Sequence, residues 1–303
     1  KPAVCFATSG PGATNLITGL TDAMMDSTPM ICITGQVPSP ALGTEAFQEA
    51  DIIGMTLSCT KWNCQVRAPE DIAEAIRFGA EVAMQGRPGP VLIEITKDAQ
   101  INAPRDNYEF PVLPPIASVP PRAKTPSTVQ STDADNLAAA AALLNAAERP
   151  LILAGHGVQI SGAEQTLVKL AEHSQIPVAC TLLGLSLIDT RHPLYAGMLG
   201  MHGNLAPNLL TNEADVILAV GMRFDDRVTG RLDCYAPNAR IIHIEIDAGQ
   251  IGKCVPTQVA LVGDAQDMLT ALKPLIHRTE RADWLSRFDR LACKEFSELS
   301  RSE

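Results

Sequence analysis

Residues 215–230 read DVILAVGMRFDDRVTG, and this stretch indicates the fold of the chain. Its first part, Asp215–Gly221, is a short run rich in Val, Ile and Leu, which is typical of a strand buried on both faces of a parallel sheet. Ligands of open α/β sheets lie beyond the carboxyl ends of such strands. A charged cluster follows the glycine at once, consisting of Arg223, Asp225, Asp226, Arg227 and Arg231.

This cluster has two interpretations. Arg223 and Arg227 could hold a phosphorylated ligand, with the aspartates orienting them or reaching a ribose or ring nitrogen. The alternative is a solvated loop whose charges pair among themselves.

Outward from this stretch, residues 132–277 alternate between helical and strand patterns. Strands are expected at 149–154, 176–180, 240–246 and 259–262, and helices at 135–147, 163–173, 204–211 and 265–275. The order predicts a doubly wound sheet of about five or six strands.

Glycines and polar residues stand at the predicted strand ends of this region. Gly155 and Gly157 allow close approach of a backbone to a ligand, although their spacing to Gly162 misses the dinucleotide fingerprint. Glu245 ends a late strand, where it could take ribose hydroxyls or simply cap a helix. No HxxxH or HxH pair is present, so no metal site is predicted, and His156 and His202 are also consistent with polar loop residues. Together the loops favour a nucleotide-like ligand.

The first region, residues 1–101, repeats the alternation. Strands are expected at 3–8, 29–34 and 91–95, and helices at 13–25 and 69–84, which predicts a second parallel sheet. The turn Ser9–Gly12 precedes a helix and could bind an anion, but no GKS or GKT follows, so a structural turn is the simpler interpretation.

Between the two regions, residues 102–131 carry seven prolines, which forbid a regular helix and predict an extended connector. We therefore expect a domain boundary here. Residues 278–303 are expected to be a tail. The chain opens directly on a strand pattern, so we expect a piece of a longer protein.

Composition narrows the function classes. The 303 residues suffice for about two domains, and only 4% aromatic residues predict aliphatic cores. A formal charge of −10 without a basic cluster argues against nucleic acid and acidic membranes. No apolar run is long enough for a membrane span, no signal peptide is evident, and eight cysteines without a CxxC pair favour a reducing, cytoplasmic compartment.

Eight motifs in order resemble one family, the large catalytic subunit of acetohydroxyacid synthase, also called acetolactate synthase. They are ATSGPGATN (7–15), TGQVP (34–38), GTEAFQEAD (43–51), CTKW (59–62), GRPGPVLIEITKD (86–98), MLGMHG (198–203), VGMRFDDRVTG (220–230) and IIHIEID (241–247). The resemblance covers most of the chain except the linker and the tail. It implies a thiamine-diphosphate enzyme that condenses two pyruvates, or pyruvate with 2-oxobutanoate, in branched-chain amino acid synthesis.

The resemblance also implies roles for individual residues. Residues 1–101 would be an incomplete pyrimidine-binding domain, and 132–277 the central FAD-binding domain. Pro11, Asn15 and Gln48 would lie near the aminopyrimidine, and Asp26 and Arg87 would reach toward FAD. The FAD site would be lined by Gly155, Gly157, Thr181, Leu182, Leu199, Met201, His202, Gly221, Arg223, Asp225, Arg227, Val228, Glu245, Ile246, Gln250, Asp264 and Ala265.

Gln48, Lys97 and Phe47 are the catalytic candidates. Phe47 and Lys97, with Met201 and Asp226, would border the substrate channel, which in this family also receives herbicides around Pro38 and Ala46. The family's catalytic glutamate would lie before Lys1, and its Mg²⁺ and diphosphate motif in a third domain after residue 303. We therefore expect the isolated chain to be inactive.

The resemblance implies a homodimer or larger assembly and allows a regulatory small subunit. Two other functions remain open: a non-catalytic FAD- or nucleotide-binding module, and another thiamine-diphosphate carboligase or oxidase. The motifs around Gln48 and Lys97 favour the synthase.

Overall fold

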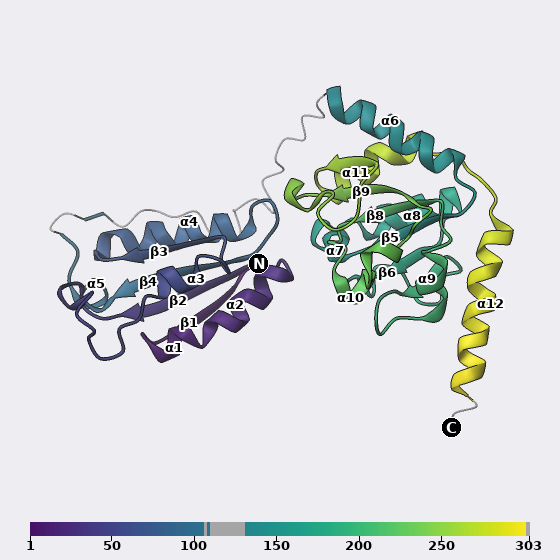
Figure 1. The fold of residues 1–303 in the computed structure, drawn as a ribbon. Helices are drawn as coiled ribbons and strands as arrows, with labels where there is room; N and C mark the ends of the chain where they lie inside the picture. The colour runs from purple at the N-terminus through teal and green to yellow at the C-terminus, as the bar shows by residue number, and fades with distance from the viewer. Residues whose placement is uncertain (106–107, 110–130, 301–303) are drawn as a thin grey trace. The chain divides into compact units, whose positions relative to one another are not determined.

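The computed structural model describes residues 1–105, 108–109 and 131–300, and the chain divides into two compact units, Lys1–Pro126 and Ser127–Glu303 (Figure 1). Most of the predicted proline-rich linker lies outside the described residues. Each unit is described by itself.

The first unit is built on a parallel four-stranded sheet with the order β1-β2-β4-β3. The strands are β1 (Ala3–Ala7), β2 (Met30–Gln36), β3 (Trp62–Val66) and β4 (Pro90–Thr96). The helices are α1 (Pro11–Thr14), α2 (Leu16–Met25), α3 (Ile52–Thr56), α4 (Ile72–Met84) and α5 (Lys97–Ile101), with short 3₁₀ turns at Ser39–Ala41 and Pro69–Asp71.

Both faces of this sheet carry a core. On one face, Ala80 and Ala83 of α4 pack on Val91 and Ile93 of β4. On the other, residues of α1, α2 and α3 pack on Cys32 and Leu92. Small residues on α4 let the helix lie close to the sheet: a Cβ added at Gly79 would meet the Ile93 side chain at 3.2 Å. Alternate residues of each inner strand therefore serve opposite faces, as a doubly covered parallel sheet requires.

The second unit is built on a parallel six-stranded sheet with the order β10-β9-β8-β5-β6-β7. The strands are β5 (Pro150–Ala154), β6 (Val178–Cys180), β7 (Tyr195–Met198), β8 (Val216–Val220), β9 (Arg240–Glu245) and β10 (Val259–Val262). The helices are α6 (Ser131–Ala146), α7 (His156–Ser161), α8 (Glu164–Ser174), α9 (Leu205–Leu210), α10 (Asp226–Thr229), α11 (Ala265–Leu272) and α12 (Ala282–Leu299). Short 3₁₀ turns span Leu182–Gly184, Leu232–Cys234, Ala248–Gln250 and Lys273–Leu275.

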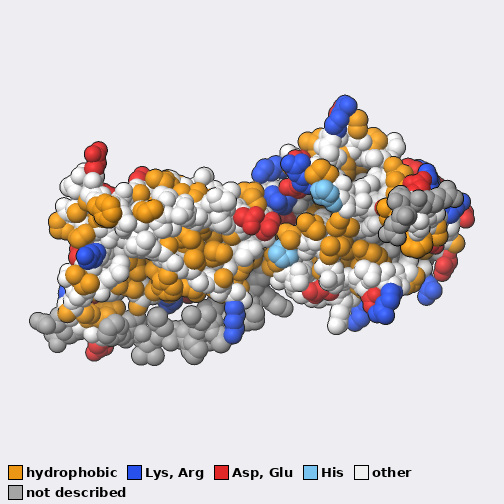
Figure 2. All heavy atoms as spheres, turned by 90° about the horizontal axis from the view of Figure 1, so that it is seen from below, with side chains coloured by type: hydrophobic (Ala, Val, Ile, Leu, Met, Phe, Trp, Pro, Cys, Tyr) orange, Lys and Arg blue, Asp and Glu red, His pale blue; other side chains and the backbone are white. Residues whose placement is uncertain are grey.

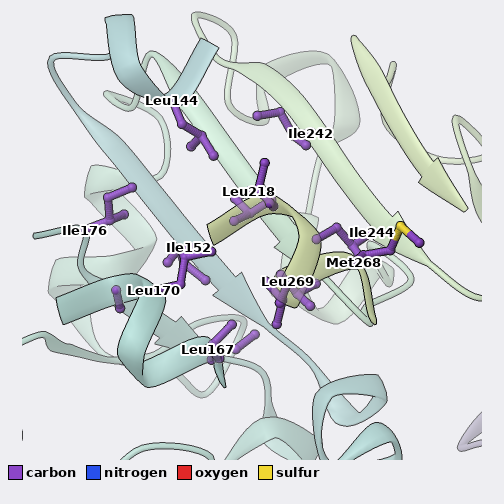
Figure 3. Packing of buried hydrophobic residues seen from close by; sticks show 14 of the residues in the cluster. Leu144, Ile152, Leu167, Leu170, Ile176, Leu218, Ile242, Ile244, Met268 and Leu269 are labelled. Carbon is purple, nitrogen blue, oxygen red and sulfur yellow. The ribbon is translucent and has the colours of Figure 1, made fainter. Parts of the chain in front are cut away.

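Two hydrophobic clusters fill the second unit. Helices α6, α7, α8 and α11 pack on one face, where Leu167, Leu170 and Leu269 surround Ile152 and Leu218 (Figure 3). Helices α9 and α12 pack on the other face, with Trp284 and Phe288 among the buried residues. The first cluster is aliphatic, as the scarcity of aromatic residues predicts.

The structure confirms the predicted parallel α/β architecture and adds the short helices α3, α5, α7 and α10, the strand β7 and the long helix α12. Strand β7 has the sequence YAGM, which is short and interrupted by glycine, so its pattern carries little strand signal. Helix α12 occupies the segment that we expected to be a tail, and its Trp284 and Phe288 are buried against the sheet. Strand β2 also runs two residues beyond the expected end, because Gly35 and Gln36 pair with Ile95 and Thr96.

Candidate functional site

The first candidate site lies at the carboxyl edge of the first sheet, where the turn after β1 meets the segment around Gln48. Gly10 has φ 59°, and a Cβ added to it would lie 2.7 Å from the backbone oxygen of Gln48. Gln48 itself has φ 62°, a conformation that costs a non-glycine residue about 1–2 kcal/mol. Pro11 follows Gly10 and Asn15 ends the short helix α1. The structure therefore places Gln48 against the turn that carries Pro11, with Asn15 one helical turn further along the chain.

The loop that carries Gln48 is fixed by its own carboxylate, Glu49. The backbone N–H groups of Gly43 and Ala46 donate to Glu49, the latter at 3.0 Å. These bonds, with the Gly43 bond contributing most, lower the pKa of Glu49. Phe47 is 88% exposed at the tip of this loop. The loop thus presents an aromatic side chain to solvent from an anchored backbone.

The segments that follow β2 and β4 carry Pro38 and Lys97, and a hydrogen bond joins these two segments. Asp98, next to Lys97, accepts a hydrogen bond from the backbone N–H of Ser39 at 2.9 Å. Chiefly because of this bond, the pKa of Asp98 falls to about 2. Lys97 is exposed at the start of α5. The segments after β2 and β4 are therefore held together at the same edge that carries Gln48.

Asp26 and Arg87 lie elsewhere in the first unit. Asp26 follows α2 and Arg87 precedes β4, so both stand at the amino edge of the sheet. The Arg87 guanidinium donates to Ser27 Oγ at 2.9 Å and to Met25 O at 2.9 Å, at the end of α2. The two residues are neighbours of each other and not of Gln48.

The second candidate site lies at the carboxyl edge of the second sheet. The chain runs from β5 outward to β6 and β7, returns to β8 beside β5, and continues outward to β9 and β10. The strand order therefore reverses between β5 and β8. A reversal of this kind opens a crevice beyond the carboxyl ends of the two central strands, where ligands of doubly wound sheets bind.

Three predicted glycines meet at this point of reversal. A Cβ added at Gly157 would lie 2.6 Å from the Cα of Gly221, and one added at Gly221 would lie 2.5 Å from the Cα of Gly157. The N–H of Gly157 donates to Gly221 O at 3.0 Å, and that of Gly155 to Val220 O at 2.9 Å. We expected Gly155 and Gly157 to allow close approach of the backbone to a ligand. In the structure, the absence of a side chain on these glycines allows the loops after β5 and β8 to pack backbone to backbone.

The charged segment after β8 is organised by Asp225. Its carboxylate accepts from the backbone N–H of Arg227 at 2.9 Å, capping α10, and lies 3.4 Å from the Arg223 guanidinium. Phe224, which lies between Arg223 and Asp225 in the sequence, has φ 54°. Its side chain is buried and contacts the ring of His243, with the two ring centroids 5.1 Å apart. The side chains of Asp226 and Arg227 are both exposed, with Arg227 Nε 4.0 Å from Asp226 Oδ2. These ion pairs are consistent with both sequence interpretations, a segment that orients cations for a ligand and a loop whose charges pair among themselves.

The loop after β7 is tied to this segment and to α9. Met201 N donates to Arg227 O at 2.7 Å. The Asn208 side chain accepts from Gly200 N and donates to Gly200 O, each at 2.8 Å. Leu199, Met201 and His202 are therefore carried by a braced backbone, while the Met201 side chain is 61% exposed.

Helix α12 supports the same loop from outside. Glu295 accepts from Leu205 N at 3.1 Å and from Asn204 Nδ2 at 3.3 Å, at the start of α9. Asn204 Oδ1 in turn accepts from Met198 N at 2.9 Å. This support joins residues about ninety positions apart, and sequence reasoning missed it because no local pattern links them.

The remaining predicted residues follow β6, β9 and β10. Thr181 Oγ1 accepts a hydrogen bond from Gly184 N at 3.1 Å. The side chain of Leu182, within this turn, is exposed. Glu245 is buried and accepts from the backbone N–H of Ile246 at 3.0 Å, so it stabilises its own turn. Asp264 caps α11 and also accepts from Ser161 Oγ. Gln250 ends the short turn after β9, and Ala265 opens α11.

A pocket of about 610 Å³ opens beside the loop after β7 and α10. Predicted residues Leu199, Met201, Asp226, Arg227 and Val228 line it. Arg231 of the predicted charged cluster also lines it, and sequence reasoning did not anticipate the rest of its wall, which comprises Gly200, Asn208, Thr211, Asn212, Thr229, Gly230 and Tyr235. The Tyr235 hydroxyl is buried without a hydrogen-bond partner in the described part of the chain, and burial raises its pKa.

Two further properties concern the described residues alone. Across residues 1–105, 108–109 and 131–300, no group of three or more His, Cys, Asp or Glu side chains could hold a metal ion. Within the same ranges, no helix combines the length and the apolar character needed to cross a membrane. All eight cysteines are free.

Two family models match this chain. Residues 1–55 match the N-terminal TPP binding domain of thiamine pyrophosphate enzymes, and residues 137–272 match the central domain of the same enzymes. The Gly10–Gln48 contact lies in the first match and the β5–β8 reversal in the second.

Three proteins similar to this chain are named acetolactate synthase. A probable acetolactate synthase large subunit of Methanocaldococcus jannaschii is 46% identical over 94% of this chain and 48% of its own length. The acetolactate synthase isozyme 1 large subunit of Escherichia coli K12 is 43% identical over 94% and 48%. The mitochondrial acetolactate synthase catalytic subunit of Saccharomyces cerevisiae is 40% identical over 96% and 44%. The chain spans about half the length of the curated relatives it matches.

Proposed function

Because this chain belongs to the thiamine pyrophosphate enzymes, we propose that it is part of an acetolactate synthase large subunit. The reaction would condense two pyruvates, or pyruvate with 2-oxobutanoate, to an acetohydroxyacid with release of CO₂, in branched-chain amino acid biosynthesis. The observation that carries the proposal is the packing of Gln48 on the Gly10–Pro11 turn, inside the segment that matches a TPP-binding domain.

The carboxyl edge of the first sheet fits the pyrimidine half of thiamine diphosphate. Gly10 cannot carry a side chain without striking Gln48, so the turn and the Gln48 loop are in close backbone contact, and the flat ring would pack beside this contact. Pro11 and Asn15 would border the ring on one side and Gln48 on the other. The bound cofactor supplies a thiazolium carbon that stabilises the charge left by decarboxylation.

The chain's own residues would orient the substrate rather than break its bonds. Phe47 and Lys97 would border the substrate channel: Phe47 would exclude water from the reacting centre, and Lys97 would attract the carboxylate of a 2-oxo acid. The Asp98–Ser39 bond would keep Pro38 beside Lys97. The glutamate of the proton relay and the Mg²⁺-diphosphate motif would be supplied by segments outside these 303 residues.

The second unit would hold FAD at the reversal between β5 and β8. Arg223, oriented by Asp225, and Arg227 supply cations for a diphosphate, and Glu245 stands at the end of β9 for a ribose. The exposed side chains of Leu182 and Met201 supply an apolar surface for a flat ring.

The proposed assembly is a homodimer or larger, with a regulatory small subunit, in the cytoplasm. Exposed hydrophobic side chains support further protein contacts. Figure 2 shows them gathered on the face of the first unit turned toward the viewer, and the exposed residues of this unit include Val4, Phe6, Met25, Phe47, Met55, Leu57, Phe78 and Ile101. The net charge of −10 supports the absence of nucleic-acid and acidic-membrane partners.

The test compares the 303-residue chain with a longer protein of the relatives' length that contains it. Supplied with thiamine diphosphate, Mg²⁺, FAD and pyruvate, the longer protein should form acetolactate and the isolated chain should not. Acetate, peroxide or another carboligation product from the longer protein would instead indicate a different thiamine-diphosphate enzyme. Turnover by the isolated chain would refute the assignment of essential groups to other segments.

A flavin spectrum tests the second unit separately. After FAD is added and excess is washed out, the chain should retain the flavin absorbance band, and the variant Arg223→Gln should retain less. Circular dichroism on both samples controls for folding. A folded chain that retains no flavin would refute the FAD site.

A further inference from the structure

A carboxylate is buried in the middle of the first sheet. Glu94 lies in β4 between Ile93 and Ile95 and is 1% exposed. Removing a charged group from water costs several kcal/mol unless hydrogen bonds compensate it. Its side chain lies on the face of the sheet that α1, α2 and α3 cover, since it alternates with Ile93 and Ile95 of the opposite core. No role described so far requires an acid there.

The two neighbouring strands supply the compensation. Gln36 of β2 donates from Nε2 to Glu94 Oε1 at 2.9 Å, and Gln65 of β3 donates from Nε2 to Glu94 Oε2 at 2.6 Å. Arg67 Nε donates to Gln65 Oε1 at 2.6 Å. Burial raises the pKa of Glu94, the two amides oppose that shift, Asp51 adds to it and Arg67 opposes it. Both carboxylate oxygens are thus bound by neutral amides.

Gln36 connects this carboxylate to the loop that carries Gln48. The same Nε2 that donates to Glu94 also donates to Ala50 O at 2.9 Å, and Gln36 Oε1 accepts from Val37 N at 2.8 Å. The amide plane of Gln36 is therefore fixed at three points. Ala50 is two residues after Gln48, whose left-handed backbone persists only where surrounding contacts hold it.

We propose that Glu94 is a positioning residue for the cofactor-binding loop. It holds the Gln36 amide, which holds Ala50 and so keeps Gln48 against the Gly10–Pro11 turn. Glu49 fixes the earlier part of the same loop through Gly43 and Ala46, and the Glu94–Gln36 pair fixes its end. The assignment to cofactor binding rests on the proposed function; the anchoring of the loop does not.

The experiment measures backbone hydrogen exchange over residues 46–51 in the 303-residue chain and in variants. Glu94→Leu fills the space but removes the acceptor for Gln36, and it should speed exchange in this loop about tenfold, with β1 and α4 unchanged. Glu94→Gln keeps one acceptor oxygen and should restore most of the protection. Gln65→Leu removes the other amide without touching the Gln36–Ala50 bond and serves as the matched control.

Wild-type exchange in the loop of Glu94→Leu, or a uniform increase across the first unit, would overturn the proposal. If Glu94→Leu does not fold, Gln36→Met removes the Ala50 bond directly and should give the same local increase. Thiamine diphosphate titration with Mg²⁺, in the longer protein, provides the second readout: Glu94→Leu should bind about tenfold more weakly, with Gln65→Leu near wild type. Failure of the wild type to bind would refute the proposed function and leave the exchange result to decide the anchoring.

Discussion

The two sheets present their carboxyl edges in different ways. In the first unit, two side-chain interactions, Asp98 with Ser39 and Gln36 with Ala50, add to the Gly10–Gln48 backbone contact. In the second unit, the two central loops pack backbone to backbone: Gly157 and Gly221 meet where β5 and β8 end. A side-chain bond can be lost without moving the backbone, whereas a glycine contact cannot accept even one added carbon. The side-chain bonds of the first edge should therefore respond to mutation and pH in steps, and the Gly157–Gly221 contact should fail abruptly.

The largest expected effect is at the glycine contact. Gly221→Ala places a Cβ 2.5 Å from the Cα of Gly157 and in a backbone with φ 59°, so overpacking and strain act together. We expect the second unit to lose about 3 kcal/mol of unfolding free energy, measured by urea denaturation.

Gly252→Ala is the matched control. Its φ is 67°, and a Cβ there would meet nothing within 4 Å, so only the strain remains, about 1 kcal/mol. Equal losses in the two variants would show that the backbone contact is not what makes this edge sensitive.

An intermediate loss of unfolding free energy is expected at Asn208, whose side chain holds the loop after β7 in the second unit. Asn208→Ala removes two hydrogen bonds to Gly200, each of 2.8 Å, and should cost about 1–2 kcal/mol while speeding hydrogen exchange at Gly200 and Met201. Asn238→Ala removes one exposed bond of 3.5 Å and should cost about 0.5 kcal/mol or less. A larger loss from Asn238 would contradict this account of the loop.

The smallest effect is the pH response of the first edge. The folded-state pKa of Asp98 is lowered from 3.8 to about 2, so its contribution to stability is present above about pH 4 and is lost as the pH falls toward 2. Asp98→Asn should flatten the acid dependence of the melting temperature in that window. Asp22→Asn, which removes a charge from α2, should leave the dependence nearer to wild type. An unchanged slope in Asp98→Asn would refute the role of the Ser39 bond.

Much of the fold could be predicted because its signals are local. The run Asp215–Gly221 predicted a buried strand, and β8 occupies Val216–Val220. The predicted strand at 259–262 coincides with β10. Alternation of such runs with helical spacing implied parallel sheets, since a parallel connection needs a crossover. The motifs that carry the resemblance are likewise short segments whose order is visible without a structure.

Part of the candidate site was also accessible from sequence. The position of Arg223 and Asp225 after a buried strand suggested that the two charges interact, and the structure places the guanidinium 3.4 Å from the carboxylate, as both sequence interpretations predict. The pairing of Gly157 with Gly221, by contrast, joins loops more than sixty positions apart. The sequence suggested only that Gly155 and Gly157 allow the backbone to come close to a ligand, and it gave no sign of their contact with Gly221.

The sequence by itself determined most of the strands and the longer helices of the two sheets, the parallel class and the family motifs, because hydrophobic periodicity and turn residues act within a few positions. Only the tertiary structure decided which strands are neighbours: β4 between β2 and β3, and β8 beside β5. Those neighbours place Gln36 and Gln65 on Glu94, and they let α12 reach α9 through Glu295. Such contacts depend on which distant segments bury their apolar faces together, and local spacing does not encode that choice.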